Sequence, residues 1–471
     1  MAAREVDHEL ERHARTVFGL PTIVWVLFLA ALAARFAAVL LVGANQWSEE
    51  TVNAAEHMSL AKSLLAGDGF SFNEAAGYAE NGVYEPSSVQ SPPYPLLLAG
   101  LYWLFGVASS KAHAAAMFIN ALAGAATVPL LYAMVRRLGG TMAAGVTAAG
   151  LIAIWPTQIY AVISVQAITL LTLATIAIVV LWYRAIDTGG VLSWTAFSVI
   201  GALAAMTEPV YLPAMFLAGC VILIHKNLAA PLRLRNGAIL LVTTICVIGP
   251  WTYRNWLVHE KFMPIKSTVW VNIWKGNNPH SGGTDRPPLT EETLALFRER
   301  GVDELRQYDY LTDEQRAELS GLRTAEREDV WKRYAKTWIS ENPWSYVKLA
   351  RNRLAKTLWW DWDNPKGRDK MYLYPASRGV LLLGSLVGVF LVVRMNWRLG
   401  MPAIIIGTSL LTYTLTIAAA RFAFPLEPFQ MALSAVVILF FLGRRPQPLR
   451  RPPAVERWLG NRGKNTGLET N

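Results

Sequence analysis

Long apolar runs separated by short polar turns dominate this chain. The runs are continuous rather than alternating, which predicts helices, because only helices and closed barrels satisfy their own backbone hydrogen bonds inside lipid. A hydrocarbon core of ~30 Å needs about 20 mostly apolar residues in a helix. The pattern predicts an all-α polytopic membrane protein with 10–11 membrane segments. These predicted segments cover residues 20–43, 91–107, 113–135, 141–163, 167–186, 191–208, 209–226, 236–253, 378–394, 401–419 and 427–443.

Two long polar stretches, 44–90 and 254–377, interrupt the apolar runs. Basic residues favour the cytoplasmic ends of membrane helices, and here they concentrate in the other turns. Those basic turns contain Arg136, Arg137, Arg184, the stretch 226–235, Arg394, Arg398 and the stretch 444–451. Both long stretches should therefore share the opposite, outer side.

An odd number of predicted segments lies between the two polar stretches, so they can share one side only if one segment does not cross. We expect segment 91–107, which opens with Pro92 and Pro93, to be re-entrant or interfacial. Ten crossings then remain, with both termini cytoplasmic. A true crossing by 91–107 is the alternative.

The segments define five regions. We expect residues 1–19 to form a cytoplasmic N-terminus without a cleavable signal, and 20–253 to form a transmembrane module whose outer catalytic loop is 44–90. Residues 254–377 form an outer loop domain with a small helical insertion, 378–443 form the last membrane helices, and 444–471 form a basic, disordered cytoplasmic tail.

Composition supports the membrane assignment. The chain of 471 residues is 53% hydrophobic and 17% charged, whereas soluble proteins carry about 25% charged residues. The net charge of +10 is explained by the cytoplasmic turns and tail, so no nucleic-acid partner is expected. Cys220 and Cys246 lie inside apolar runs, which indicates packing residues rather than a disulfide framework.

Candidate chemistry begins in the first polar stretch with Glu56. Apolar residues at 58, 60, 61, 64 and 65 predict a short amphipathic helix on the membrane surface, ending near Gly67. A carboxylate at the start of this helix can act as a general base if partial desolvation raises its pKa. The alternative is a solvated glutamate favoured by the helix dipole.

The second polar stretch and the chain end supply cations for the same face. Arg254 and Arg421 are expected at the outer ends of membrane helices, together with Arg351 or Arg353. Arginine binds phosphate in a bidentate manner, although Arg254 can instead reach toward the headgroups. Asn277 and Asn278 can bind sugar hydroxyls or shape a turn. The basic, aromatic stretch 351–360 suits a lipid headgroup surface.

No metal ligand spacing is evident, and the first polar stretch has no Asp-x-Asp motif. Asp361 and Asp363 form a weak exception, either as a cation site or as a turn before the next helix.

Four blocks resemble the GT-C glycosyltransferases, in the branch of dolichyl-phosphate-mannose protein mannosyltransferases and the lipid A aminoarabinose transferase. They occur in the same order over nearly the whole chain. The blocks are Glu56 to Phe70, Ser91 to Gly106, Pro250 to Asn255 leading to Trp274 to Pro279, and Arg421 to Pro428.

The resemblance implies a GT-C fold in the cytoplasmic membrane and inverting transfer from a polyprenyl-phosphate-linked sugar, with no cofactor or metal. The acceptor is an envelope glycan, lipid or protein at the outer face. Glu56 becomes the base, and Arg254, Arg421 and Arg353 become ligands of the donor phosphate. Substrate contacts are assigned to Tyr94, Lys275, Asn277 and Asn278.

Departures from the family pattern keep alternatives open. The family usually has Asp at the base position with Tyr nearby, so Glu49 or Glu50 can be the base instead of Glu56. Ser91 replaces the lysine of the aminoarabinose branch, and Gln166 replaces a second acid. A transporter or lipid-handling protein, with Arg35 as its mid-membrane charge, is the runner-up. A catalytically inactive scaffold is a third possibility.

Overall fold

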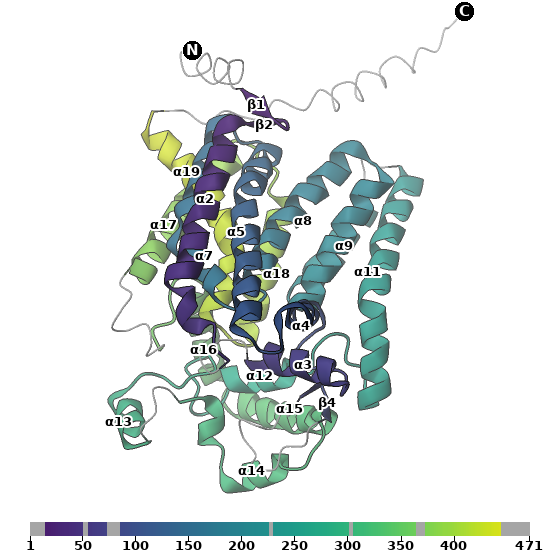
Figure 1. The fold of residues 1–471 in the computed structure, drawn as a ribbon, viewed down its shortest axis with the longest axis vertical. Helices are drawn as coiled ribbons and strands as arrows, with labels where there is room; N and C mark the ends of the chain where they lie inside the picture. The colour runs from purple at the N-terminus through teal and green to yellow at the C-terminus, as the bar shows by residue number, and fades with distance from the viewer. Residues whose placement is uncertain are drawn as a thin grey trace, which may run out of the picture.

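The structure, a computed structural model, describes residues 15–49, 55–72, 85–225, 229–300, 305–363 and 373–443. Its long helices form a bundle, and a group of polar helices lies at one end (Figure 1). The apolar helices are α2 (Thr22–Leu41), α4 (Pro93–Phe105), α5 (Ser110–Leu138), α6 (Met142–Ile154), α7 (Pro156–Tyr160), α8 (Ile168–Thr188), α9 (Val191–Thr207), α10 (Tyr211–Ile224), α11 (Ala230–His259), α17 (Leu373–Arg394), α18 (Gly400–Leu415) and α19 (Glu427–Phe441).

The polar lobe, as we call it, comprises α3 and α12 to α16. Its helices are α3 (Ala55–Ala66), α12 (Val269–Gly276), α13 (Glu291–Arg300), α14 (Asp313–Leu319), α15 (Thr324–Glu341) and α16 (Pro343–Leu358). The short elements are β1 (Thr16–Val17), β2 (Leu20–Pro21), β3 (Ser71–Phe72), β4 (Glu85–Pro86), η1 (Gly43–Gln46), η2 (Ala161–Ile163), η3 (Gln307–Tyr310) and η5 (Ala420–Leu426). Strand β1 pairs with β2, and β3 with β4, both antiparallel.

The predicted membrane segments are helical. Among the described residues, six helices are long and apolar enough to cross a membrane. A seventh span results if Met142–Ile154 and Pro156–Ile163, which bend by 52°, count as one. Helices α4, α9, α10 and α18 are shorter apolar helices. The protein is therefore an all-α, multi-pass membrane protein, as the sequence predicts.

Hydrogen bonds between distant segments define the two ends of the bundle. At the end away from the polar lobe, Asp187 accepts hydrogen bonds from Arg137 (3.4 Å) and Arg398 (2.7 Å). At the lobe end, Ser267 N donates to Ser88 O (2.9 Å), which joins the two long polar stretches. The described basic turns that contain Arg137 and Arg398 thus lie at the end opposite the joined polar stretches, as expected from the positive-inside rule.

Helix α4 is the segment predicted not to cross. Its 13 residues extend ~20 Å at 1.5 Å per residue, less than the ~30 Å hydrocarbon core. It packs against α3, and it is drawn nearly end-on in Figure 1, whereas α2 and α5 run along the bundle. Both features support the interfacial interpretation, which stays a prediction.

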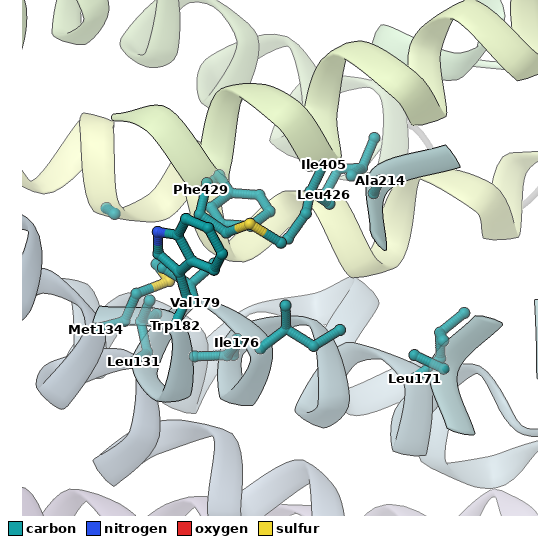
Figure 2. Packing of buried hydrophobic residues seen from close by; sticks show 14 of the residues in the cluster. Leu131, Met134, Leu171, Ile176, Val179, Trp182, Ala214, Ile405, Leu426 and Phe429 are labelled. Carbon is teal, nitrogen blue, oxygen red and sulfur yellow. The ribbon is translucent and has the colours of Figure 1, made fainter. Parts of the chain in front are cut away.

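The centre of the bundle is built by α5, α8 and α19. Figure 2 shows Met134 of α5, Trp182 of α8 and Phe429 of α19 in one buried cluster. Trp182 also packs edge-on against Trp194 of α9, with ring centroids 5.6 Å apart. Because such a core is close-packed, it fixes the positions of the helices and therefore of the loops that connect them to the polar lobe.

Arg35, in the middle of α2, is fully buried. Its Nη1 donates to Ala153 O (3.0 Å) and its Nη2 to Ile152 O (2.9 Å), in the last turn of α6. These carbonyls lose their helical partners because Pro156 starts a new, bent helix. A cation at a helix C-terminus is also favoured by the helix dipole. Arg35 therefore caps a broken helix, which removes the main support for a transport path.

A buried ion pair joins the polar lobe to the last membrane helices. Arg378 of α17 donates to Glu427 of α19 (2.8 Å), and both side chains are almost fully buried. The same guanidinium donates to Thr357 O (2.9 Å) and Leu358 O (3.0 Å) at the end of α16. Removing one partner of such a pair is strongly destabilising, so this contact holds the lobe in position.

Candidate active site

Glu56 lies in the first turn of α3, as the sequence predicts, and its side chain is exposed. Gln90 Nε2 donates a hydrogen bond to Glu56 Oε2. One turn further along α3, Leu60 and Ala61 are fully buried against the bundle. Although Glu56 keeps an accessible surface, desolvation by the surrounding protein is the largest single influence on its pKa. The Glu56 carboxylate is therefore partly desolvated by the protein but still accessible to solvent.

Two cations from distant parts of the chain act on Glu56. Lys275 comes from the last turn of α12 and Arg421 from η5, and the positive charge of each lowers the pKa of Glu56. Both cations also act on Asp285, in the turn after α12. The structure therefore brings three of the predicted site residues together and adds a carboxylate that the sequence did not single out.

Cations outnumber carboxylates in this cluster. Asp285 pairs with Arg306, and Arg286 Nη1 lies 3.7 Å from Asp285 Oδ1. Desolvation raises the pKa of Asp285, but the four neighbouring cations more than offset it, so Asp285 is ionised. A site with excess positive charge attracts anions such as phosphate. The cluster consists of Glu56, Asp285, Lys275, Arg286, Arg306 and Arg421.

The environment of Glu56 corrects one prediction. Desolvation raises its pKa, as expected, but the hydrogen bond from Gln90 and the charges of Lys275 and Arg421 outweigh that effect. The net pKa of Glu56 lies below its ordinary value, so the predicted rise is wrong. The reason is that hydrogen bonds and opposite charges favour the ionised form more than burial disfavours it.

His57 and Tyr94 form an aromatic contact beside Glu56. Their ring centroids lie 5.0 Å apart. Burial lowers the pKa of His57 to about 4, although Glu56 opposes the shift, so His57 is neutral at pH 7. Tyr94, at the start of α4, is 3% exposed. Its predicted contact with substrate stays a prediction.

Arg254 fixes the first polar stretch to α11. Its Nη1 donates to Ser87 O (2.8 Å) and its Nη2 to Phe70 O (3.0 Å). The guanidinium also lies over the ring of Trp251, 4.8 Å from the centroid. These contacts give Arg254 a structural function that the sequence did not reveal. Phosphate binding by Arg254 stays a prediction that the contacts do not support.

Arg353 and Asn277 are buried together away from solvent. Arg353 Nη1 donates to Asn277 Oδ1 (2.8 Å) and to Gly276 O (2.6 Å), and neither side chain is exposed. Burial lowers the pKa of Arg353 to about 10. Asn278 accepts a hydrogen bond from His280 N (2.9 Å), which is the turn-forming alternative. These contacts favour structural functions for all three residues rather than phosphate or sugar binding.

Asp361 and Asp363 bind cationic side chains. Lys356 pairs with Asp363 and lies 3.4 Å from Asp361, while Arg286 lies 3.9 Å from Asp361. The cation-site alternative is therefore unsupported, because protein cations already neutralise the carboxylates. Within the described ranges, no group of three His, Cys, Asp or Glu residues could hold a metal ion.

The structure describes one of the two alternative bases, Glu49, and places it outside this cluster. Glu49 is exposed and pairs with Lys62 of α3. Glu50, also predicted as a catalytic residue, lies outside the described residues.

Sequence reasoning missed Gln90 and Asp285. Gln90 directly precedes the Ser91-Pro92-Pro93 block, so its position beside a family motif was an available signal. Asp285 offered none, because its neighbours in the cluster come from other segments.

Comparisons with known proteins address the fold. No family model matches the sequence, and no curated protein matches it. The solved structure of the oligosaccharyltransferase AglB from Archaeoglobus fulgidus, in complex with an inhibitory peptide and a dolichol-phosphate, matches with a TM-score of 0.51 and 14% identity. ArnT from Cupriavidus metallidurans, bound to undecaprenyl phosphate, matches with a TM-score of 0.38 and 14% identity.

These matches differ in extent. The AglB match covers 96% of this chain and 52% of the AglB chain. The ArnT match covers 87% of this chain and 76% of the ArnT chain. At such low identity the AglB likeness shows the fold, so the predicted GT-C-like fold is confirmed. Because the chain spans about half the length of AglB, the activity and partners of that protein carry over only as proposals.

Proposed function

We propose that this protein transfers a sugar from a polyprenyl-phosphate carrier to a hydroxyl acceptor at the outer face of the cytoplasmic membrane. The observation that carries the proposal is an accessible, ionised Glu56 beside Lys275 and Arg421, where the membrane bundle meets the polar lobe. The similar fold of AglB, whose structure contains a dolichol-phosphate, supports a lipid-phosphate donor. The acceptor is a glycan, a lipid or a protein.

The proposed reaction is a direct displacement with inversion. Glu56 accepts the proton of the acceptor hydroxyl while the acceptor oxygen forms a bond to the anomeric carbon. The bond between that carbon and the phosphate oxygen breaks, and polyprenyl phosphate leaves. Lys275 and Arg421 stabilise the negative charge that grows on the leaving phosphate, as preorganised positive groups do. These side chains supply that stabilisation without a metal ion.

The low pKa of Glu56 fits this sequence of events. In the free protein, Lys275 and Arg421 stabilise the carboxylate and so weaken it as a base. A bound donor phosphate attracts the same two cations and opposes the charge of Glu56, which raises its pKa. The base therefore becomes stronger once the donor is in place.

Substitution of the two cations tests the proposal. Hydrogen bonds to charged groups contribute about 1.5–3 kcal/mol, so Lys275→Gln or Arg421→Gln should weaken donor affinity by about 10- to 150-fold. Donor titrations of the purified full chain, following release of polyprenyl phosphate, measure this effect. Arg298→Gln, an exposed cation of α13, is the matched control and should match wild type. Activity only with nucleotide sugars, or unchanged donor affinity in both site variants, would contradict the proposal.

A further inference from the structure

Helix α16 carries an exposed stripe of apolar and basic side chains. Its members recur every three or four residues, which places them on one face of the helix. Trp344 is 84% exposed and Val347 is 55% exposed. The opposite face is buried and includes Leu349, Arg353 and Lys356. We call the exposed set the α16 stripe: Trp344, Val347, Lys348, Arg351 and Leu354.

Both ends of α16 meet the last membrane helices. Tyr346 donates to the carbonyl of Leu415, the last residue of α18 (3.2 Å). Just beyond the C-terminal end of α16, Trp359 Nε1 donates to Pro375 O in the first turn of α17 (3.0 Å). Figure 1 shows α16 between the bundle and the rest of the polar lobe. The helix therefore lies at the level where membrane helices leave the hydrocarbon core.

The apolar surface of those helices continues toward the stripe. On α18, Leu411 is 61% exposed and Leu415 is partly exposed; on α17, Val380 and Leu383 are more than half exposed. Exposed apolar side chains on membrane helices face lipid. These lipid-facing side chains lie on α17 and α18, the two helices that α16 and its C-terminal end contact. We therefore infer that the same bilayer covers Trp344 and Leu354.

The charge of the stripe selects the kind of lipid. Lys348 and Arg351 are exposed, and neither forms an ion pair with another described residue. Arg351 makes only a long hydrogen bond to its neighbour Asn352 (3.5 Å). Tryptophan favours the membrane interface, and basic residues beside a membrane attract anionic headgroups.

We propose that α16 is an interfacial helix whose stripe binds anionic phospholipid headgroups in the leaflet next to the polar lobe. The main alternative is that a second copy of the chain binds to this face of α16. The lipid is favoured because the stripe combines tryptophan with two cations and continues the lipid-facing surface of α17 and α18. The proposal is independent of the glycosyltransferase activity.

A probe on the stripe tests lipid contact directly. In a full chain whose Cys220 and Cys246 are replaced by Ala, Val347→Cys carries an environment-sensitive fluorophore. The protein is placed in nanodiscs of phosphatidylcholine, with or without phosphatidylglycerol, that contain a headgroup-attached quencher. The label should be quenched in both and more strongly with phosphatidylglycerol. A label at Ala317→Cys, exposed on α14, is the control and should stay unquenched. If the two sites behave alike, the proposal is wrong.

Removing the cations tests the headgroup preference. Each near-membrane cation contributes roughly 1 kcal/mol, so Lys348→Gln with Arg351→Gln should weaken phosphatidylglycerol binding by about 10- to 30-fold. Titration of phosphatidylglycerol into detergent-solubilised protein measures the affinity. The double variant Arg298→Gln with Lys332→Gln removes the same charge elsewhere on the lobe and should leave it unchanged.

Three outcomes would overturn the proposal. The first is equal loss of affinity in both double variants. The second is displacement of phosphatidylglycerol by equimolar inorganic phosphate, which would indicate a site for free phosphate. The third is protection of residue 347 only in a dimer, which would assign the stripe to a second copy of the chain.

Discussion

Glu56→Gln removes the proposed base while keeping the size and shape of the side chain. General-base catalysis contributes typically ~10²–10⁴-fold, which corresponds to about 3–5 kcal/mol of activation free energy. We expect turnover to fall by this order at saturating donor. The same reasoning predicts that donor binding persists, because Lys275 and Arg421 remain in place.

The cost to folding should be far smaller than the cost to catalysis. Glu56 is exposed, and within the described part of the chain its side chain accepts a hydrogen bond from Gln90. Exposed charged contacts typically contribute ~0–1 kcal/mol because solvent screens them. The free energy of unfolding should therefore change by less than about 1 kcal/mol. Release of polyprenyl phosphate measures turnover, and thermal unfolding of the same samples measures stability.

Glu49→Gln is the matched control, because it removes a carboxylate from an exposed ion pair with Lys62 outside the cluster. Its activity should stay close to wild type. If Glu56→Gln remains active while Glu50→Gln is inactive, the fold stands but the base is Glu50. If all three variants remain active, the first polar stretch does not supply the base and the proposed mechanism is refuted.

Three further predictions follow from single contacts. Gln90→Leu removes a hydrogen bond that lowers the pKa of Glu56. Glu56 should then protonate at higher pH, so the acid limb of the pH–rate profile should move to higher pH. An unmoved acid limb would contradict this prediction. Arg378→Met leaves the fully buried Glu427 without its cation and should lower stability by ~3–5 kcal/mol in chemical unfolding, whereas a change below 1 kcal/mol speaks against a structural ion pair. Gly124→Ala places a methyl group 2.8 Å from Nε of the buried Arg35 and should lower the free energy of unfolding by ~1–3 kcal/mol. Gly150→Ala is the control and should not destabilise the protein, because open space surrounds Gly150. Equal effects of the two substitutions would refute the packing argument.

The sequence by itself determined the membrane bundle and the position of the candidate base. Continuous apolar runs can only be helices in lipid, and the basic turns separate the ends of the bundle. Arg137 and Arg398 lie at the same end of the bundle, where both contact Asp187, as that rule predicts. The amphipathic period after Glu56 likewise predicted α3, because a helix on a membrane surface must turn one face toward apolar neighbours.

Tertiary structure decided which polar residues are available for chemistry. Arg353 and Lys275 are both cations in the second polar stretch, but Arg353 is buried against backbone carbonyls while Lys275 acts on Glu56. Arg254 is similarly bound to the carbonyls of another segment. The sequence shows the residue type and the local hydrophobic periodicity. The residues that contact a charged side chain come from distant segments, and only the packing of the core brings them together. The direction of the Glu56 pKa shift depends on those partners, so only the assembled fold could determine it.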